Sequence, residues 1–180
     1  MGSQLRERLI ASRTVFEGRL IAVRVDEVEL PDGKRATREI VPHPGAVVIA
    51  PLLDDGRVVM IQQYRHAAGK VLWELPAGLL EAGEDPEQAA RRELAEEVGY
   101  EAGEMRRLFS AYLSPGFSGE LAHVFLARRL RKVEARAESD EHIRAALLPL
   151  SEAVAMVRRG EVQNAPAICG LLAVAQWWSG

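Results

Sequence analysis

The sequence predicts a mixed α/β domain that follows a small antiparallel β-subdomain. Residues 9–41 contain alternating polar and apolar segments with a hairpin turn among them, which is typical of antiparallel strands. Residues 45–53, GAVVIAPLL, form a nearly continuous apolar run, as expected for a strand that is covered on both faces. Residues 86–98 form a capped helix with one apolar side, which we expect to pack against a sheet.

The N-terminal strands are expected in the segments IASRTVFEG, RLIAVRVDEVEL and KRATREIV, and the turn PDGK, residues 31–34, separates the last two. We therefore divide the chain into an N-terminal β-strand extension, residues 1–42, and a main domain, residues 43–180. In the main domain, the turn Asp54-Asp55-Gly56 leads from the apolar run into a second strand, RVVMIQQYRH.

Beyond the helix, MRRLFSAYL and ELAHVFLARRL are expected to pair as a hairpin. The loop SPGFSGE, residues 114–120, lies between them and is too rich in glycine for regular structure. IRAALLPL predicts another short strand. Ser151 is expected to cap a helix that stops at Gly160, and a mostly apolar helix follows from Pro166.

Composition narrows the class of protein. The chain has 180 residues, 48% of them hydrophobic, and a net charge of −3, which predicts a globular protein without the basic field that nucleic acid requires. The N-terminus has no apolar signal-like core, and no run of about 18 apolar residues predicts a membrane span. Cys169 is the single cysteine, so no internal disulfide forms. We expect a cytoplasmic protein that binds neither nucleic acid nor membrane.

The chemistry concentrates on the helix at residues 86–98. Asp85 is expected as its N-cap, Pro86 at its first position and Gly99 at its left-handed end. Glu93, Glu96 and Glu97 are spaced three and four residues apart, so their carboxylates share one side, where they repel each other. A solvated acidic face is one interpretation of this spacing. The other is a Mg²⁺ site, since Mg²⁺ binds through carboxylate oxygens.

The stretch from Gly78 to Tyr100 matches the Nudix box, G-x5-E-x7-R-E-U-x-E-E-x-G-U, where U is a bulky apolar residue. The matching residues are Gly78, Glu84, Arg92, Glu93, Leu94, Glu96, Glu97 and Gly99, with Tyr100 at the last apolar position. The chain is thus identified as a member of the Nudix hydrolase superfamily. QYRH and WELPAG before the box, and Pro115 located 15 residues after it, resemble the ADP-ribose pyrophosphatase branch.

This resemblance implies an α/β/α sandwich with a mixed sheet, in a homodimer whose N-terminal strands exchange between subunits and help bind adenosine. It implies a Mg²⁺-dependent enzyme, with Mn²⁺ or another divalent cation possible, that hydrolyses ADP-ribose to AMP and ribose 5-phosphate. Two or three cations are expected. The ligands that it implies are Glu93, Glu96, Glu97 and the carbonyl of Ala77. Arg92 is interpreted as an orienting residue for the box carboxylates, with Glu84 as its support.

The same resemblance makes Arg38 and Arg65 substrate contacts to phosphate or the terminal ribose. Pro115 and Gly116 lie in the glycine-rich SPGFSGE loop, which is expected to close over a ligand. A glutamate in the acidic segment after the box is expected as the general base, and Glu138 and Glu141 are the two candidates. The rival activities are hydrolysis of another substrate, such as GDP-mannose, ADP-glucose, NADH or a flavin nucleotide, and nucleotide binding without cleavage. The three retained carboxylates argue against binding alone.

Overall fold

The computed structural model describes residues 5–135 and 142–177. These residues belong to two compact units. The first unit joins the N-terminal residues up to Pro44 with Tyr112–Leu121, and the second contains Gly45–Ala111 and the chain from Ala122 onward. The SPGFSGE loop thus belongs to the same unit as the N-terminal strands.

The first unit is built on a three-stranded antiparallel sheet in the order β1-β2-β3, formed by β1 (Arg8–Glu17), β2 (Ala22–Glu29) and β3 (Arg35–Ile40). These strands confirm the predicted antiparallel N-terminal segments. Gly33 adopts φ of +83° in the turn between β2 and β3, a conformation that glycine reaches at no steric cost. The SPGFSGE loop is fixed at Val41, whose N–H donates to the carbonyl of Phe117 at 2.8 Å.

Among its described residues, the second unit contains two sheets and three α-helices. One sheet has the order β10-β5-β6 and the other has the order β7-β4-β9-β8, in which β4 and β9 run parallel while β4 and β7 run antiparallel. Its elements are β4 (Ala46–Pro51), β5 (Arg57–Arg65), the 3₁₀ turn η2 (His66–Ala68), β6 (Lys70–Glu74), β7 (Ala77–Leu79), α1 (Pro86–Val98), β8 (Tyr100–Tyr112), β9 (Leu121–Lys132), β10 (Arg144–Pro149), α2 (Leu150–Arg158) and α3 (Ala165–Trp177).

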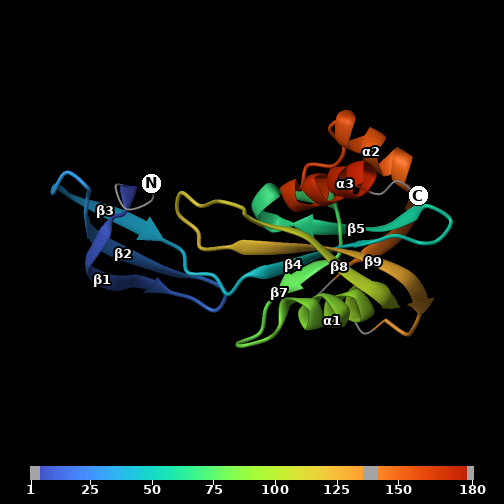
Figure 1. Cartoon of the computed structure of the whole chain (residues 1–180), viewed down its shortest axis with the longest axis horizontal. Helices are drawn as coiled ribbons and strands as arrows, with labels where there is room; N and C mark the ends of the chain where they lie inside the picture. The colour runs from blue at the N-terminus through green and yellow to red at the C-terminus, as the bar shows by residue number, and fades with distance from the viewer. Residues whose placement is uncertain (1–4, 136–141, 178–180) are drawn as a thin grey trace. The chain divides into compact units, whose positions relative to one another are not determined.

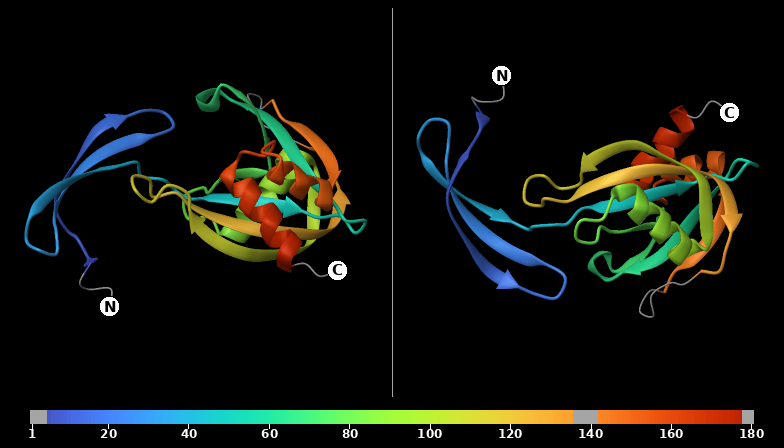
Figure 2. Two further views of the ribbon diagram at one scale, coloured as in Figure 1. Left: turned by 90° about the horizontal axis from the view of Figure 1, so that it is seen from above. Right: turned by 60° about the horizontal axis from the view of Figure 1, so that its bottom comes forward.

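The sheets lie between two helical layers, as the α/β/α expectation requires. Figure 1 shows α2 and α3 on one side of β4 and α1 on the other, and the view from above in Figure 2 has α3 crossing in front of β4. Alternate residues of β4 enter the two layers, because successive side chains of a strand point to opposite faces. Val48 packs with Leu171 of α3, whereas Val47 packs with Leu94 of α1.

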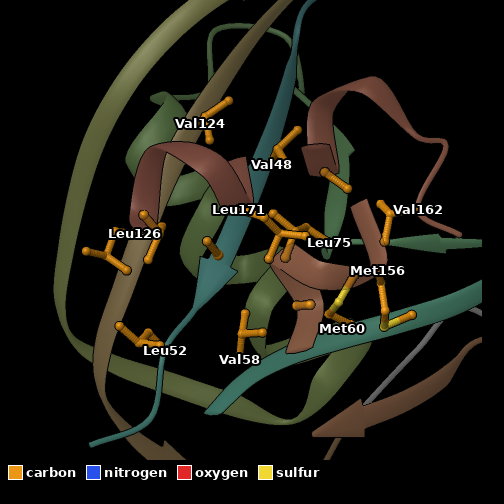
Figure 3. Packing of buried hydrophobic residues seen from close by; sticks show 14 of the residues in the cluster. Val48, Leu52, Val58, Met60, Leu75, Val124, Leu126, Met156, Val162 and Leu171 are labelled. Atoms are coloured by element: carbon orange, nitrogen blue, oxygen red, sulfur yellow. The ribbon is translucent and has the colours of Figure 1, made fainter. Parts of the chain in front are cut away.

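The core explains why β4 reads as an unbroken apolar run. Every residue of β4 is buried, since both of its faces are covered. Figure 3 shows Val48, Leu75 and Leu171 converging in the cluster on the side of α2 and α3. Burial of each such side chain stabilises the fold by about 1.5–3 kcal/mol. The core therefore holds both sheets in place beneath α1.

Two local predictions differ from the structure. β8 begins at Tyr100, directly after the left-handed Gly99, and so starts earlier than the predicted strand MRRLFSAYL. The predicted cap of α2 is also wrong: the N-cap is Pro149, no side chain caps the helix, and Ser151 lies inside it. The strand β10 ends at Pro149 and α2 begins at the next residue, so the N-cap position holds a proline, which has no polar side chain. In the described part of the chain, no helix is long and apolar enough to cross a membrane.

Candidate active site

The site is built where β7 leads into α1. Asp85 caps the helix as predicted, because its Oδ1 accepts the N–H groups of Glu87 at 2.9 Å and Gln88 at 3.2 Å. Pro86 occupies the first position and Gly99 ends the helix with φ of +67°. The apolar side of α1, which includes Ala90 and Leu94, is buried against the sheets. Because the start, the end and the buried side of α1 are all fixed, the direction in which each of its carboxylates points is fixed as well.

Gly78 leaves the space that Glu93 occupies. A Cβ atom at Gly78 would lie 2.0 Å from the carboxyl carbon and from Oε1 of Glu93, far inside any allowed contact. Gly78 does not adopt positive φ, so close approach and not backbone conformation requires a glycine here. The Glu93 carboxylate consequently rests directly on the backbone of β7, with a side-chain exposure of 13%.

Arg92 holds the acidic side of the helix together. Its Nε and Nη2 bond to the two oxygens of Glu84 at 3.1 and 3.0 Å, and its Nη1 bonds to Glu93 at 2.6 Å and to Glu96 at 3.2 Å. Nη2 also donates to the carbonyl of Leu79 at 3.2 Å. The hydrogen bonds to Glu84 raise the pKa of Arg92 strongly. Burial lowers this pKa, but the bonds to Glu93 raise it again, so the net shift is upward. The guanidinium therefore keeps its charge at every accessible pH.

Glu84 and Glu97 have different environments. The Arg92 guanidinium, and then the backbone N–H of Glu81, hold the pKa of Glu84 below its ordinary value. Glu97 is 7% exposed, and its Oε2 accepts the N–H of Ala77 at 3.0 Å. One oxygen of Glu97 is thereby fixed against β7, next to the residue whose carbonyl was expected as a metal ligand.

The carboxylate and carbonyl oxygens expected as ligands are of the type that binds magnesium, but their arrangement does not form a complete coordination site. Within the described residues, no three acidic, histidine or cysteine side chains form a group able to hold a cation. Nη1 of Arg92 bonds to both Glu93 and Glu96, so these two carboxylates face the guanidinium. Carboxylate and carbonyl oxygens are nevertheless the ligands that Mg²⁺ prefers, and Mg²⁺ keeps several waters, so it needs few protein ligands.

Arg65, the last residue of β5, bonds to a buried partner that the sequence reasoning missed. Its Nε and Nη2 donate to the two oxygens of Glu74 at 3.0 and 2.7 Å. The side chain of Glu74 is 3% exposed and that of Arg65 is 44% exposed. The signal available in the sequence was the position of Glu74 in WELPAG, in the segment that leads into the box.

The remaining predicted substrate residues lie in the first unit. Arg38 makes a bidentate pair with Glu7, through Nε at 3.1 Å and Nη2 at 2.5 Å. Pro115 and Gly116 lie in a turn that is closed by the N–H of Phe117 donating to the carbonyl of Ser114 at 3.1 Å. Each of these residues is therefore ordered within its own unit.

The two candidates for the general base, Glu138 and Glu141, lie outside the described residues. A second polar pair that the sequence did not indicate joins β8 to β9, where Ser110 Oγ and His123 Nδ1 are 2.8 Å apart. Burial, and then the charge of Arg107, lower the pKa of His123. The alternation of polar and apolar residues along a strand predicts on which face of the sheet a side chain lies, but it does not predict its cross-strand partner. No sequence signal therefore marks Ser110 and His123 as a pair.

The acidic helix α1 packs on β7, where Gly78 makes room for Glu93, and both belong to an α/β/α sandwich. This is the arrangement of a Nudix hydrolase. The chain belongs to the Nudix family: residues 41–170 match the NUDIX domain, and residues 7–41 match the nucleoside diphosphate sugar hydrolase N-terminal domain. It is therefore a hydrolase of this family, as its box predicted.

Individual relatives resemble nearly the whole chain. The ADP-ribose pyrophosphatase of Bacillus subtilis (strain 168) is 42% identical over 163 residues, which cover 89% of this chain and 88% of the relative. The ADP-ribose pyrophosphatase of Mycobacterium tuberculosis (strain ATCC 25618 / H37Rv) is 46% identical over 169 residues, which cover 92% and 81%. A solved structure of an ADP compounds hydrolase shares the fold, with a TM-score of 0.87 at 24% identity, covering 98% of this chain and 96% of that chain.

Proposed function

We propose that this Nudix hydrolase splits ADP-ribose into AMP and ribose 5-phosphate in a Mg²⁺-dependent reaction. The observation that carries the proposal is the similarity to two ADP-ribose pyrophosphatases, at 42% and 46% identity across about nine tenths of the chain. Water attacks one phosphorus of the diphosphate, the bridging P–O bond breaks, and the water oxygen remains on one of the two products. All of the box carboxylates needed for this chemistry are present.

Glu93, Glu96 and Glu97, with the carbonyl of Ala77, are the residues that would hold Mg²⁺. When bound, the cation neutralises the diphosphate, whose negative charge otherwise repels an incoming hydroxide. Arg92 orients the carboxylates through its bonds to Glu93 and Glu96 and takes no part in the bond cleavage. Mn²⁺ is an alternative cation because it has the same preference for oxygen ligands.

Two arginines bind the substrate in this proposal. Arg65 contacts the phosphates or the terminal ribose, since a guanidinium bonds phosphate oxygens in pairs. Arg38 does so from the N-terminal extension, where its present partner is an exposed glutamate. The loop that holds Pro115 and Gly116 closes over the ligand. Either Glu141 or Glu138 removes the proton from the attacking water.

The active form is proposed to be a homodimer with exchanged N-terminal strands, with residues 1–42 on the adenosine side and residues 43–180 forming the hydrolase domain. Support comes from β1, in which nine of the ten residues are exposed and the remaining one, Ile10, is half-buried. Leu9, Val15 and Phe16 expose 56%, 46% and 54% of their surfaces. An exposed apolar strand of this length favours pairing with another chain.

Product analysis tests the function. The purified chain is incubated with Mg²⁺ and, separately, with ADP-ribose, GDP-mannose, ADP-glucose, NADH and FAD, and nucleotide products are separated by chromatography. AMP with ribose 5-phosphate, formed fastest from ADP-ribose, supports the proposal. Faster cleavage of another substrate assigns the rival specificity, and no cleavage of any substrate leaves nucleotide binding. Reaction in oxygen-18 water then shows which phosphorus is attacked.

Metal dependence has its own test. EDTA should abolish AMP release, and excess Mg²⁺ should restore it. Glu93→Gln should reduce turnover at every Mg²⁺ concentration, whereas Glu87→Gln should not. Glu87 lies on the same helix but faces solvent and pairs with Arg91, so it controls for loss of a helical carboxylate. Equal effects of the two substitutions would remove the acidic cluster from the mechanism.

A further inference from the structure

Glu74 has no role in the chemistry described so far, yet among the described residues of the second unit it is the most deeply buried carboxylate. It is 2% exposed and ends β6, where its cross-strand partner on β5 is Ile61. Ile61 packs in the core cluster beneath α1. Opposite residues of two paired strands share a face, so Glu74 is directed toward the layer that contains the acidic helix. A carboxylate at such a position is costly unless it is paired.

Both oxygens of Glu74 are committed to Arg65. The Nε and Nη2 atoms of Arg65 approach them in parallel, at 3.0 and 2.7 Å, which is the fork geometry that fixes the plane of a guanidinium as well as its position. Arg65 is 44% exposed although its partner is almost fully buried. Glu74 therefore anchors the guanidinium of Arg65, which still reaches the surface.

Glu74 also begins the segment that supports the acidic helix. Three residues further on, the N–H of Ala77 donates to Glu97, and at the next residue Gly78 receives the carboxylate of Glu93. Residues 74–78 thus contact Arg65 at one end and two expected metal ligands at the other. This short segment fixes the cationic group relative to the carboxylates, as the two halves of a diphosphate site require.

We propose that Glu74 is a positioning residue for substrate binding, which holds the Arg65 guanidinium in the plane and at the place where it meets the phosphates or ribose of the nucleotide. The inference rests on the proposed function, since it takes Arg65 as a substrate contact. Glu74 itself does not touch the substrate. Its removal therefore weakens binding through Arg65 and leaves the cleavage step intact.

The test compares Glu74→Gln, Arg65→Lys and the double variant in ADP-ribose hydrolysis at saturating Mg²⁺, with melting temperatures measured in parallel. Glutamine keeps the shape of the side chain but only one acceptor oxygen. We expect KM to rise about tenfold, or about 1.4 kcal/mol, in both single variants, with kcat within threefold of wild type. The double variant should be no worse than Arg65→Lys alone, because both changes remove one interaction.

The matched control is Glu87→Gln, which breaks another pair in which Nε and Nη2 of one arginine contact a glutamate, on the exposed side of α1. Its KM should not change. An unchanged KM in Glu74→Gln with a lower melting temperature would show a purely structural pair, and additive effects in the double variant would separate Glu74 from Arg65. If Glu74→Gln does not fold, Glu74→Asp, which keeps the charge and shifts the oxygens, decides in the same way. Failure of the proposed function is distinct, because the wild-type chain would then release no AMP from ADP-ribose.

Discussion

Replacing Gly78 with alanine tests whether the acidic helix works only in its observed seat. The new Cβ would lie 2.0 Å from the carboxyl carbon of Glu93, and real Cβ atoms essentially never come within 3.0 Å of a heavy atom beyond their own residue and its chain neighbours. The carboxylate must therefore retreat by about 1 Å. A displacement of about 1 Å at a reacting centre can cost about 100-fold in rate, which corresponds to about 2.7 kcal/mol of transition-state stabilisation.

We accordingly expect Gly78→Ala to lower kcat for ADP-ribose about 100-fold and to raise the Mg²⁺ concentration that gives half-maximal rate. The folded state should lose about 1 kcal/mol, the low end for overpacking, because the clash is with the end of a flexible side chain. The assay is AMP release across a Mg²⁺ titration, with thermal unfolding in parallel. Gly103→Ala is the control, since its Cβ would meet the exposed Arg129 at 3.0 Å.

A kcat for Gly78→Ala within threefold of wild type would refute this reasoning, because Glu93 would then tolerate displacement. A loss of the same size in Gly103→Ala would also refute it, since any added methyl group would have the effect.

Three further predictions concern other parts of the molecule. Arg92→Lys should lower kcat about 10- to 100-fold, because a compact ammonium lacks the planar fork that bonds both oxygens of Glu84 while reaching Glu93 and Glu96. Arg91→Lys serves as its control, and equal rates would contradict the orienting role. Phe16→Asp places a charge on the exposed strand and should therefore convert a dimer into a monomer, as measured by light scattering. An unchanged dimer mass would contradict the proposed interface. The lowered pKa of His123 means that the folded state binds its proton less readily than the unfolded chain does. Stability that His123 contributes above its ordinary pKa of about 6.5 is therefore lost as the pH falls. His123→Gln should flatten the dependence of melting temperature on pH between about pH 7.5 and pH 5.5, and an identical slope would contradict the shift.

The sequence predicted those features that depend on local rules. Asp85, Pro86 and Gly99 define α1 through capping and backbone preferences, which need only neighbouring residues. The fully buried β4 was predictable from its apolar run, since covered strands have no polar alternation. Ser151 resembled a cap but was not one, because the preceding strand continues directly into the helix.

Long-range pairings were less accessible. Glu74 and Arg65 are nine residues apart and meet through the register of β5 and β6, which composition does not determine. Gly78 and Glu93 are a similar case: the box pattern requires both residues, but only the packing of α1 on β7 shows that one makes room for the other. A sequence motif therefore identifies the participants, and the tertiary structure supplies the physical reason for each.

The acidic helix posed a question in the sequence, since Glu93, Glu96 and Glu97 repel each other at helical spacing. A bound cation was one expected compensation. The structure adds a second, because Arg92 bonds to Glu93 and Glu96 while Ala77 donates to Glu97.

The pKa of Arg92 is raised, so its guanidinium remains charged. An entering cation would compete with this guanidinium for the oxygens of Glu93 and Glu96. Three box carboxylates, Glu84, Glu93 and Glu96, share the one guanidinium of Arg92, and Glu97 adds a fourth carboxylate, so the acidic groups outnumber the cationic one. In the proposed reaction this excess would attract the divalent ion. Glu84, which bonds two of the arginine's nitrogens, would remain a partner of Arg92 when Glu93 and Glu96 bind the metal.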